Sequence, residues 1–280
     1  MTTVVIPAHN ESRVLGRLLG QLMSGAQAHQ MNVIVVANGC TDNTADVAAT
    51  FGPGVRVLSV PLASKHHALI TGDGAATGFP RIYVDADVEL RARDVVALAG
   101  ELRRPGVLAA APERVLALDG RPWPVRWYYD IWSRLPEVRQ GLFGRGVIAV
   151  NERGHQRIAG LPPLLADDLV ASLSFAAHER RISSAARVTC HPPRTLRDLL
   201  RRRVRAATGV IQIERSRQAP PSSARTRLPD LLMIVRDEPA MAPRVALFLS
   251  VAILARLRAR RAVARGDYST WLRDESSRSA

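Results

Sequence analysis

The feature that most constrains the fold of this chain is a series of short apolar runs that alternate with helical periodicity. The runs cover Val4–Ile6, Val33–Val36, Val55–Val60 and Arg81–Val84. Between the first two, apolar residues recur at helical spacing from Glu11 to Met23. Successive runs begin roughly 20–30 residues apart, which is the length of a strand with its crossover helix. The pattern predicts an α/β fold with a mostly parallel sheet flanked by helices.

Beyond residue 87 the alternation becomes less regular. An aromatic-rich segment, residues 122–136, has helical spacing that indicates core packing, and stacking on sugars or contact with lipid is the alternative. A glycine-bearing loop is expected over Gly141–Gly146, and from Thr195 the chain becomes basic and helical. The remaining expected elements are helices over residues 94–102 and 169–177 and strands over residues 107–111, 147–150 and 181–188.

We expect three parts in the chain: an α/β domain over residues 1–215, a Pro/Ser linker over 216–228, and a basic helical extension over 229–280. The polar tail of the extension carries Trp271. Within the extension, Val245–Leu257 is an apolar run of 13 residues, whereas a membrane span needs about 20. The run therefore predicts a buried helix or a helix lying at a membrane interface. Arginines at its end favour anionic lipid headgroups, and a packing helix with a solvated basic end is the alternative. These arginines are Arg256, Arg258, Arg260, Arg261 and Arg265.

The formal net charge of +14 indicates an anionic partner, which is a nucleotide, a membrane surface or a nucleic acid. The two cysteines, Cys40 and Cys190, do not form a pair with metal-site spacing, and they fit a reducing compartment. No signal-peptide pattern precedes the first strand. We therefore expect a cytoplasmic protein, with peripheral contact to the inner face of the plasma membrane as an open alternative.

Polar residues follow each of the four predicted strands. They are Pro7-Ala8-His9-Asn10-Glu11, Asn38-Gly39-Cys40-Thr41-Asp42, Ser64-Lys65-His66-His67 and Asp85-Ala86-Asp87. The carboxyl ends of parallel strands meet at one edge of a sheet, where α/β proteins bind their ligands. Helix N-termini at this edge favour phosphates, and paired carboxylates suit Mg²⁺ or Mn²⁺ carrying a phosphate. Asn10, Asn38 and Asp42 would alternatively serve as turn and cap residues.

In their order and spacing these motifs resemble glycosyltransferase family 2, the inverting enzymes with a GT-A fold. Two later segments add to the resemblance: Leu165-Ala166-Asp167-Asp168 before a helix, and the basic stretch Arg201–Arg205. The resemblance covers roughly residues 1–210 and implies a GT-A, Rossmann-like sheet followed by the basic helical C-terminal extension.

The resemblance also implies roles for individual residues. Asp87 and His191 would contact Mn²⁺ or Mg²⁺, with Asp85 nearer the ribose as the first carboxylate of the DXD motif. Asp168 would be the general base, with Asp167 as the competing candidate and helix capping as the other interpretation of both. Arg203 lies in the region where related enzymes contact the donor diphosphate. The residues expected to bind the nucleotide sugar are Pro7, Ala8, Asn10, Glu11, Asn38, Asp42, Lys65, Asp85, Ala86, Arg202 and Arg205.

The chain departs from the family pattern in two places. Ala37-Asn38-Gly39-Cys40 stands where many members have Asp-Asp-Gly-Ser, so a uridine base is only the default expectation. Arg205 is followed by Ala206 without the Gln-x-x-Arg-Trp signature of processive members, which favours transfer of a single sugar. The acceptor is left open among a glycan, a lipid carrier and a small metabolite.

Three other functions compete with this interpretation. A nucleotidyltransferase that makes nucleotide sugars would carry a Gly-rich loop after the first strand, where this chain has Pro7-Ala8-His9-Asn10. A dinucleotide-dependent oxidoreductase would need its glycine fingerprint there too, and Gly72-Asp73-Gly74 lies elsewhere. A basic nucleic-acid-binding protein would leave the polar strand ends unexplained, so no nucleic-acid partner is expected.

Overall fold

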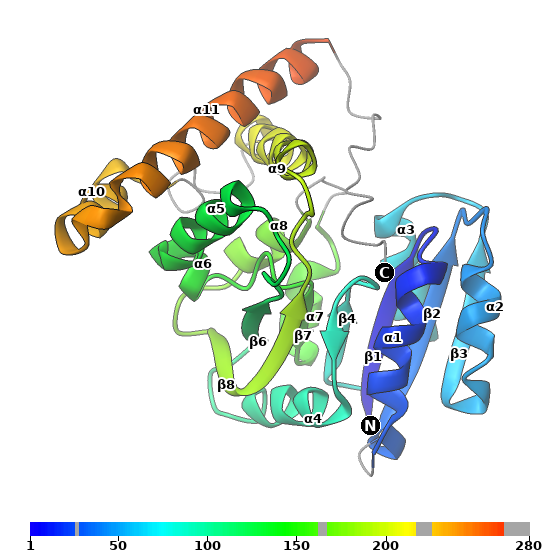
Figure 1. Cartoon of the computed structure of the whole chain (residues 1–280). Coiled ribbons are helices and arrows are strands. Elements are labelled where there is room, and N and C mark those ends of the chain that lie inside the picture. Colours follow the sequence, from blue (N-terminus) through cyan, green and yellow to red (C-terminus); the bar gives the residue numbers. More distant parts are fainter. Residues whose placement is uncertain (26–27, 162–166, 217–225, 266–280) are drawn as a thin grey trace.

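The computed structural model describes residues 1–25, 28–161, 167–216 and 226–265. Its centre is a sheet of eight strands in the order β3-β2-β1-β4-β7-β6-β8-β5 (Figure 1). The strands are β1 (Thr2–Ala8), β2 (Met31–Asn38), β3 (Val55–Val60), β4 (Arg81–Val84), β5 (Glu89–Leu90), β6 (Ala109–Leu116), β7 (Val147–Val150) and β8 (Arg180–Cys190). The four N-terminal strands pair in parallel, as the sequence predicts.

The other half of the sheet is mixed. Strand β7 runs antiparallel to both β4 and β6, and β8 pairs parallel to β6 and antiparallel to β5. Strand β6 extends past the predicted residues 107–111 because its pairing with β8 shifts register between Pro112 and Glu113. A register shift tolerates proline, which lacks the N–H that a regular ladder requires.

Helices cover both faces of the sheet. On one face, α1 (Ser12–Met23) contacts α2 (Thr44–Ala49) and α4 (Ala92–Glu101). On the other, α3 (Lys65–Ala75) packs on β1 and β2, and α7 (Glu152–Ile158) packs on β7. Helix α8 (Asp167–Leu173) is shorter than the predicted 169–177, because Phe175 already packs in the core and Ala176 N donates to Glu179 in a turn. The α/β architecture predicted from the sequence is confirmed.

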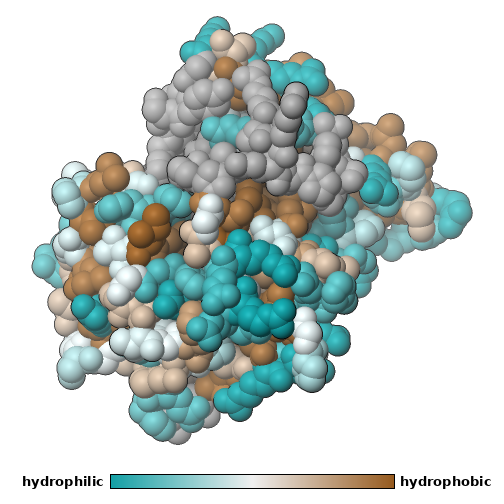
Figure 2. Space-filling model, turned by 180° about the vertical axis from the view of Figure 1, so that it is seen from behind, coloured by the Kyte–Doolittle hydropathy of each residue, from teal (hydrophilic) through white to brown (hydrophobic). Residues whose placement is uncertain are grey.

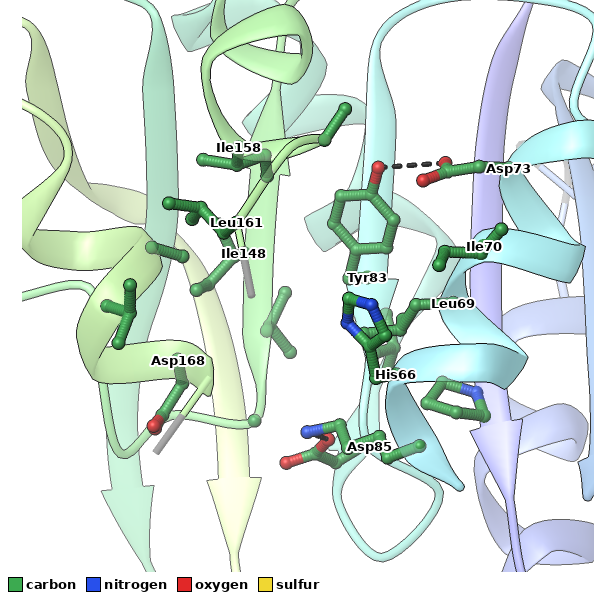
Figure 3. A pocket seen from close by; sticks show the side chains of 18 residues that line it. His66, Leu69, Ile70, Asp73, Tyr83, Asp85, Ile148, Ile158, Leu161 and Asp168 are labelled. Atoms are coloured by element: carbon green, nitrogen blue, oxygen red, sulfur yellow. Dashed lines mark hydrogen bonds and ion pairs between the residues drawn. The ribbon is translucent and has the colours of Figure 1, made fainter. Parts of the chain in front are cut away.

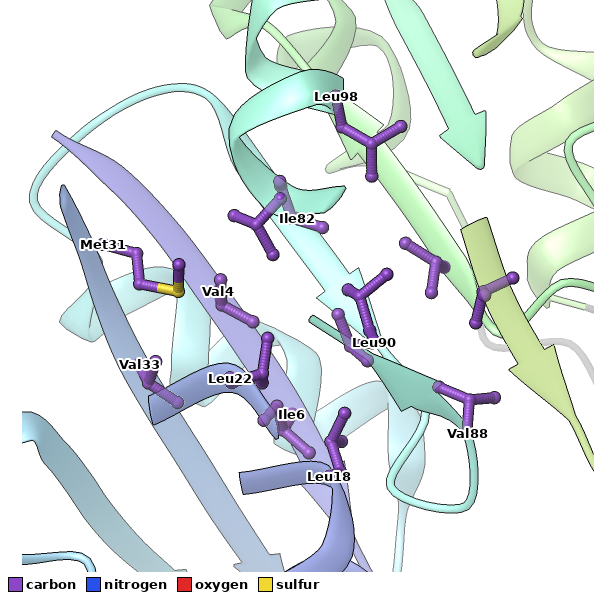
Figure 4. Close-up of a cluster of buried hydrophobic side chains, with 14 of the residues drawn as sticks. Val4, Ile6, Leu18, Leu22, Met31, Val33, Ile82, Val88, Leu90 and Leu98 are labelled. Carbon is purple, nitrogen blue, oxygen red and sulfur yellow. The ribbon is translucent and has the colours of Figure 1, made fainter. Parts of the chain in front are cut away.

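The larger hydrophobic core lies between the sheet and α1 and α4 (Figure 4). Strand residues alternate between faces, so Val4 and Ile6 point into this core beside Leu18 and Leu22. Val5 points to the opposite face, where Gly72 of α3 lies so close that an added Cβ would meet the Val5 side chain. Gly72 therefore permits close helix–sheet packing, and it is no part of a dinucleotide fingerprint.

A second apolar cluster joins the aromatic segment to the C-terminal helices. It combines α5 (Trp123–Arg134) and α9 (Leu196–Ser216) with α10 (Leu228–Asp237) and α11 (Ala242–Ala264), and α6 (Pro136–Gln140) lies at its edge. The Tyr128 ring stacks on that of Phe248, with centroids 5.0 Å apart. In Figure 1, α11 lies across α9, on the opposite side of the molecule from α2. The aromatic segment is thus a packing helix, although Trp123 remains exposed.

Helix α11 is longer than the predicted run. Together with the turn before it, Pro239–Ala264 is long and apolar enough to cross a membrane by length and composition, and little of it is buried in the protein. Most of the predicted linker and Trp271 lie outside the described residues.

Candidate functional site

A cleft opens on the α3 side of the sheet, over the adjacent strands β4 and β7 (Figure 3). It is bounded by α3 on one side and by α7 and α8 on the other. Four of the predicted site residues line it together: Pro7, Lys65, Asp85 and Asp168. These residues come from four separate segments, so the fold brings together groups that are far apart in the sequence.

Asp85 begins the turn after β4, where it meets the N-terminus of α3. Lys65 Nζ lies 2.8 Å from Asp85 Oδ1. The Asp85 side chain is 39% exposed, so the ion pair faces the open cleft. Gly39 brings α3 into position: its φ is +56°, its N–H donates to Val60, and an added Cβ would lie 2.6 Å from the Cβ of Ala63. The turn after β2 therefore needs glycine in order to pack against the segment that leads to Lys65.

The loop Gly141–Gly146 connects the two carboxylates of the cleft. Asp85 N donates to Gly146 O at 2.7 Å, and Gly144 N donates to Asp168 Oδ2 at 2.7 Å. The other oxygen of Asp168 accepts from the backbone N of Leu169 at 2.8 Å. Both Gly144 and Gly146 have a φ near +67°, and an added Cβ on Gly146 would clash with Val88. The loop thus fixes Asp168 relative to Asp85.

Two arginines that the sequence analysis did not single out hold this loop. Arg145 is buried, and its guanidinium donates to four backbone carbonyls, those of Gly141, Pro112, Val138 and Arg139. Burial, together with the charge of Arg114, lowers the pKa of Arg145 to about 10. Arg114 donates to Gly144 O at 3.0 Å and stacks on the Trp132 ring. The glycines beside Arg145 were the only feature of the sequence that pointed to this loop, and no motif predicted a role for Arg114 or Arg145.

The ends of β1 and β2 are joined by side chains that the sequence predicted for nucleotide binding. Asn10 has a φ of +51°, which Asn tolerates, and its Oδ1 accepts from Thr41 N at 2.8 Å. Asn38 is buried and its side-chain amide donates to Ala8 O, while its Oδ1 lacks a partner within the described part of the chain.

The starts of α1 and α2 are held by Asp42 and Glu11. The Asp42 carboxylate accepts hydrogen bonds from Ser12 N and Thr44 N. These bonds outweigh the effect of burial, so the pKa of Asp42 is lowered. Glu11 is buried, and its backbone N donates to Thr44. These residues hold the turns where the two strands lead into α1 and α2.

Asp87 lies farther along, beside the end of β8. Glu89 pairs with Thr189 in antiparallel register, so Asp87 and His191 reach the same end of this short ladder. His191 Nε2 lies 2.7 Å from Glu89 Oε1. Burial of Glu89 is outweighed by hydrogen bonds from Gln21 and His191 and by the charge of Arg17, so its pKa is lowered. Among the residues that the structure describes, no three Asp, Glu, His or Cys side chains form a metal cluster by themselves.

The predicted diphosphate contacts lie on α9, where Arg202 and Arg205 are half-buried. Burial raises the pKa of the Cys190 thiol to about 11, and the charges of Arg202 and Asp87 both act on that thiol. Arg202 and Asp87 therefore both lie near Cys190. Ala8 and Ala86 are buried. Asp167 is the first residue of α8.

A family model for glycosyl transferase family 2 matches residues 3–154. The chain belongs to this family. It is 34% identical over 141 residues to an uncharacterized glycosyltransferase of Mycobacterium tuberculosis, covering 48% of this chain and 62% of that protein. It is also 37% identical over 99 residues to a 4,4'-diaponeurosporenoate glycosyltransferase of Staphylococcus aureus, covering 34% of this chain and 26% of that protein. The chain thus spans less than two thirds of these curated relatives.

Solved structures share the fold. A mannosyltransferase of Pyrobaculum calidifontis, solved with GDP-Man and Mn²⁺, has a TM-score of 0.59 and 21% identity, covering 99% of this chain and 84% of that one. Glucosyl-3-phosphoglycerate synthase of Mycobacterium tuberculosis, solved with Mn²⁺, UDP and glucosyl-3-phosphoglycerate, has a TM-score of 0.55 and 20% identity, covering 79% and 81%. The family 2 membership and the glycosyltransferase fold inferred from the motifs are both confirmed.

Proposed function

We propose that this family 2 enzyme transfers one sugar, with inversion, from a nucleotide sugar to an acceptor hydroxyl. The observation that carries the proposal is the Gly141–Gly146 loop, which bonds to the backbone of Asp85 and to the carboxylate of Asp168 at once. A single displacement needs the leaving diphosphate and the base on opposite sides of the sugar. Asp85 and Asp168 come from opposite walls of one cleft, which suits this division of roles (Figure 3).

The nucleotide would lie at the ends of β1, β2 and β4. Asn10, Glu11 and Asp42 hold the turns that would surround it, and the buried Oδ1 of Asn38 is an acceptor suited to a nucleobase N–H. Lys65, already beside Asp85, would contact the diphosphate, and Arg202 and Arg205 would add positive charge from α9. A UDP-sugar is the default donor. Structural neighbours have been solved with both GDP-Man and UDP, so guanine and uracil are both candidate nucleobases.

The donor set of this edge fits Mn²⁺ or Mg²⁺. Asp87 would hold the ion with Asp85 nearby, and His191 would add a nitrogen, because its Nε2 already engages Glu89 and its Nδ1 is the atom left to ligate. A carboxylate on the far nitrogen is the usual support of a metal-binding histidine. Such ions take phosphate oxygens as further ligands, so three protein ligands are not required. When bound, the metal would neutralise charge on the departing diphosphate.

In the proposed reaction, Asp168 takes the proton of the acceptor hydroxyl. The acceptor oxygen forms a bond to the anomeric carbon while the bond from that carbon to the diphosphate oxygen breaks. The hydrogen bonds from Gly144 N and Leu169 N orient the carboxylate for this step. They do not neutralise it, since both donors are uncharged amides.

We further propose a cytoplasmic enzyme that rests peripherally on an anionic membrane through α10 and α11. Ile253, Leu254 and Leu257 on α11 are 58%, 41% and 48% exposed, and Leu232 and Met233 extend the apolar surface on α10. Figure 2 shows brown and teal side chains interleaved on the projecting end that these helices form. The arginines after Leu257 would meet the headgroups.

The decisive experiment compares Asp168→Asn with Asp167→Asn. Asp168→Asn is expected to lower the rate of sugar transfer at least about a hundredfold, because the proton acceptor is lost. Binding of UDP with Mn²⁺, followed by calorimetry, should change little. Asp167→Asn serves as the matched control and should retain transfer. Loss of transfer in Asp167→Asn alone would assign the base to Asp167, and full activity in both variants would contradict the mechanism. A thermal-shift screen of nucleotide sugars with Mn²⁺ would supply the donor for these assays.

A further inference from the structure

The cleft between Asp85 and Asp168 continues past both carboxylates into an apolar recess. Leu69 and Ile70 of α3 form one wall, and Ile148, Ile158 and Leu161 form the other (Figure 3). Val170 and Ala171 of α8 complete the lining. The recess therefore begins where the acceptor hydroxyl would react and leads away between side chains that are mostly hydrocarbon, with the His66 imidazole beside Leu69.

The polar groups at the far end of the recess are already bonded to one another. Tyr83 Oη lies 2.8 Å from Asp73 Oδ1 and 3.0 Å from His155 Nδ1. Arg81 donates to the same Asp73 oxygen at 2.9 Å. Burial and the neighbouring Asp73 raise the pKa of Tyr83, so its phenol stays protonated at physiological pH. Asp73 and Tyr83, which line the recess, are thus engaged in hydrogen bonds at this end of it.

Such a lining discriminates between classes of acceptor. A sugar hydroxyl placed against Leu69, Ile148 or Ile158 would lose its hydrogen bonds to water without gaining a partner, which disfavours binding. Hydrocarbon in the same position is favoured, because apolar surface is removed from water. The recess thus suits an acceptor that is apolar directly beyond its reacting hydroxyl.

We propose that this recess binds the hydrocarbon part of an amphiphilic alcohol, whose hydroxyl lies beside Asp168 as the acceptor. The proposal rests on the glycosyl transfer proposed above and narrows its acceptor from the three open classes to an apolar one. Its second support is continuity: Asp85 and Asp168 belong to the same cavity as the apolar walls, so an acceptor that reaches Asp168 has the recess adjoining it.

The test uses the full chain, the fluorescent probe N-phenyl-1-naphthylamine and 1-decanol. The probe should bind, and decanol but not glucose should displace it. Ala159→Trp places a large ring at the exposed rim of the recess and should weaken decanol binding about tenfold, equivalent to about 1.4 kcal/mol. The matched control is Ala177→Trp, at an alanine that is also exposed but does not line the recess; this variant should bind decanol as the wild type does.

The comparison of the two variants also separates binding in the recess from any binding of the probe to the exposed apolar face of α11. Equal decanol affinity in Ala159→Trp and Ala177→Trp would overturn the proposal. Transfer to a free sugar in preference to decanol, once the donor is known, would overturn it as well. Binding of UDP with Mn²⁺ is measured in parallel, because its absence would count against the donor site and not against the recess.

Discussion

At the scale of single residues, Lys65 stands out because it is the only lysine in a chain with 39 basic residues. Every other residue among these 39 is an arginine, including the proposed diphosphate contacts on α9. A lysine ammonium is a compact point charge, whereas a guanidinium is broad and planar. Beside Asp85, a compact cation would leave space for the proposed diphosphate between α3 and the end of β4.

We therefore predict that Lys65→Ala weakens binding of UDP with Mg²⁺ by about tenfold to a hundredfold, the value of one charge-assisted hydrogen bond. Lys65→Arg should not restore wild-type affinity. Calorimetry measures both, and Arg103→Ala, which removes an exposed charge after α4, is the control. Reductive methylation with ¹³C-formaldehyde labels only Lys65 and the N-terminal amine, so the Lys65 resonance should shift when UDP is added. An unshifted resonance would place the diphosphate elsewhere.

At the scale of elements, hydrophobic periodicity predicted the N-terminal strands and α1 closely, because a parallel sheet buries whole apolar runs. The mixed half was less predictable. Strand β5 has only two residues, and it exists because Leu90 packs in the core beside β8. The carboxylates were visible as motifs, but the loop that joins them depends on Arg145, whose four backbone partners are spread over a distant strand and a helix end. Such tertiary bonds leave no periodic signal.

Helix α11 has two apolar faces, and only one of them is covered by the protein. Val245, Phe248 and Val251 are buried, whereas Ile253 and Leu257 project outward. The double substitution Ile253→Glu with Leu257→Glu should therefore lower partitioning onto phosphatidylglycerol vesicles at least about tenfold, since it replaces inserted apolar groups with charges that the headgroups repel.

Sedimentation with vesicles measures this partitioning. The matched control is Leu62→Glu with Val115→Glu, which changes two exposed apolar residues outside α10 and α11. Equal loss in both double variants would indicate a general effect of negative charge. Unchanged partitioning in the α11 variant would refute membrane contact through this face.

At the scale of the whole molecule, helix α11 packs onto α5 and α9. Phe248 of α11 stacks on Tyr128 of α5, and Leu199 of α9 belongs to the same cluster. Because one apolar cluster contains residues from both sides of the predicted linker, deleting residues 241–280 would expose the α5 and α9 surfaces. Vesicle release by such a deletion would then mix unfolding with loss of membrane contact, and point substitutions on the outer face avoid this.

The shared cluster predicts that the extension and the domain unfold together. Phe248→Ala should lower the free energy of unfolding of the whole chain by about 3–5 kcal/mol, the usual cost of removing a buried phenylalanine ring. Leu257→Ala, on the exposed face of the same helix, should cost less than about 1 kcal/mol. Urea denaturation followed by Trp fluorescence and by circular dichroism measures both, and the two probes should give coincident transitions. If instead Phe248→Ala produces an early transition with a second one at the wild-type midpoint, residues 229–280 fold as a separate unit on an independently stable domain.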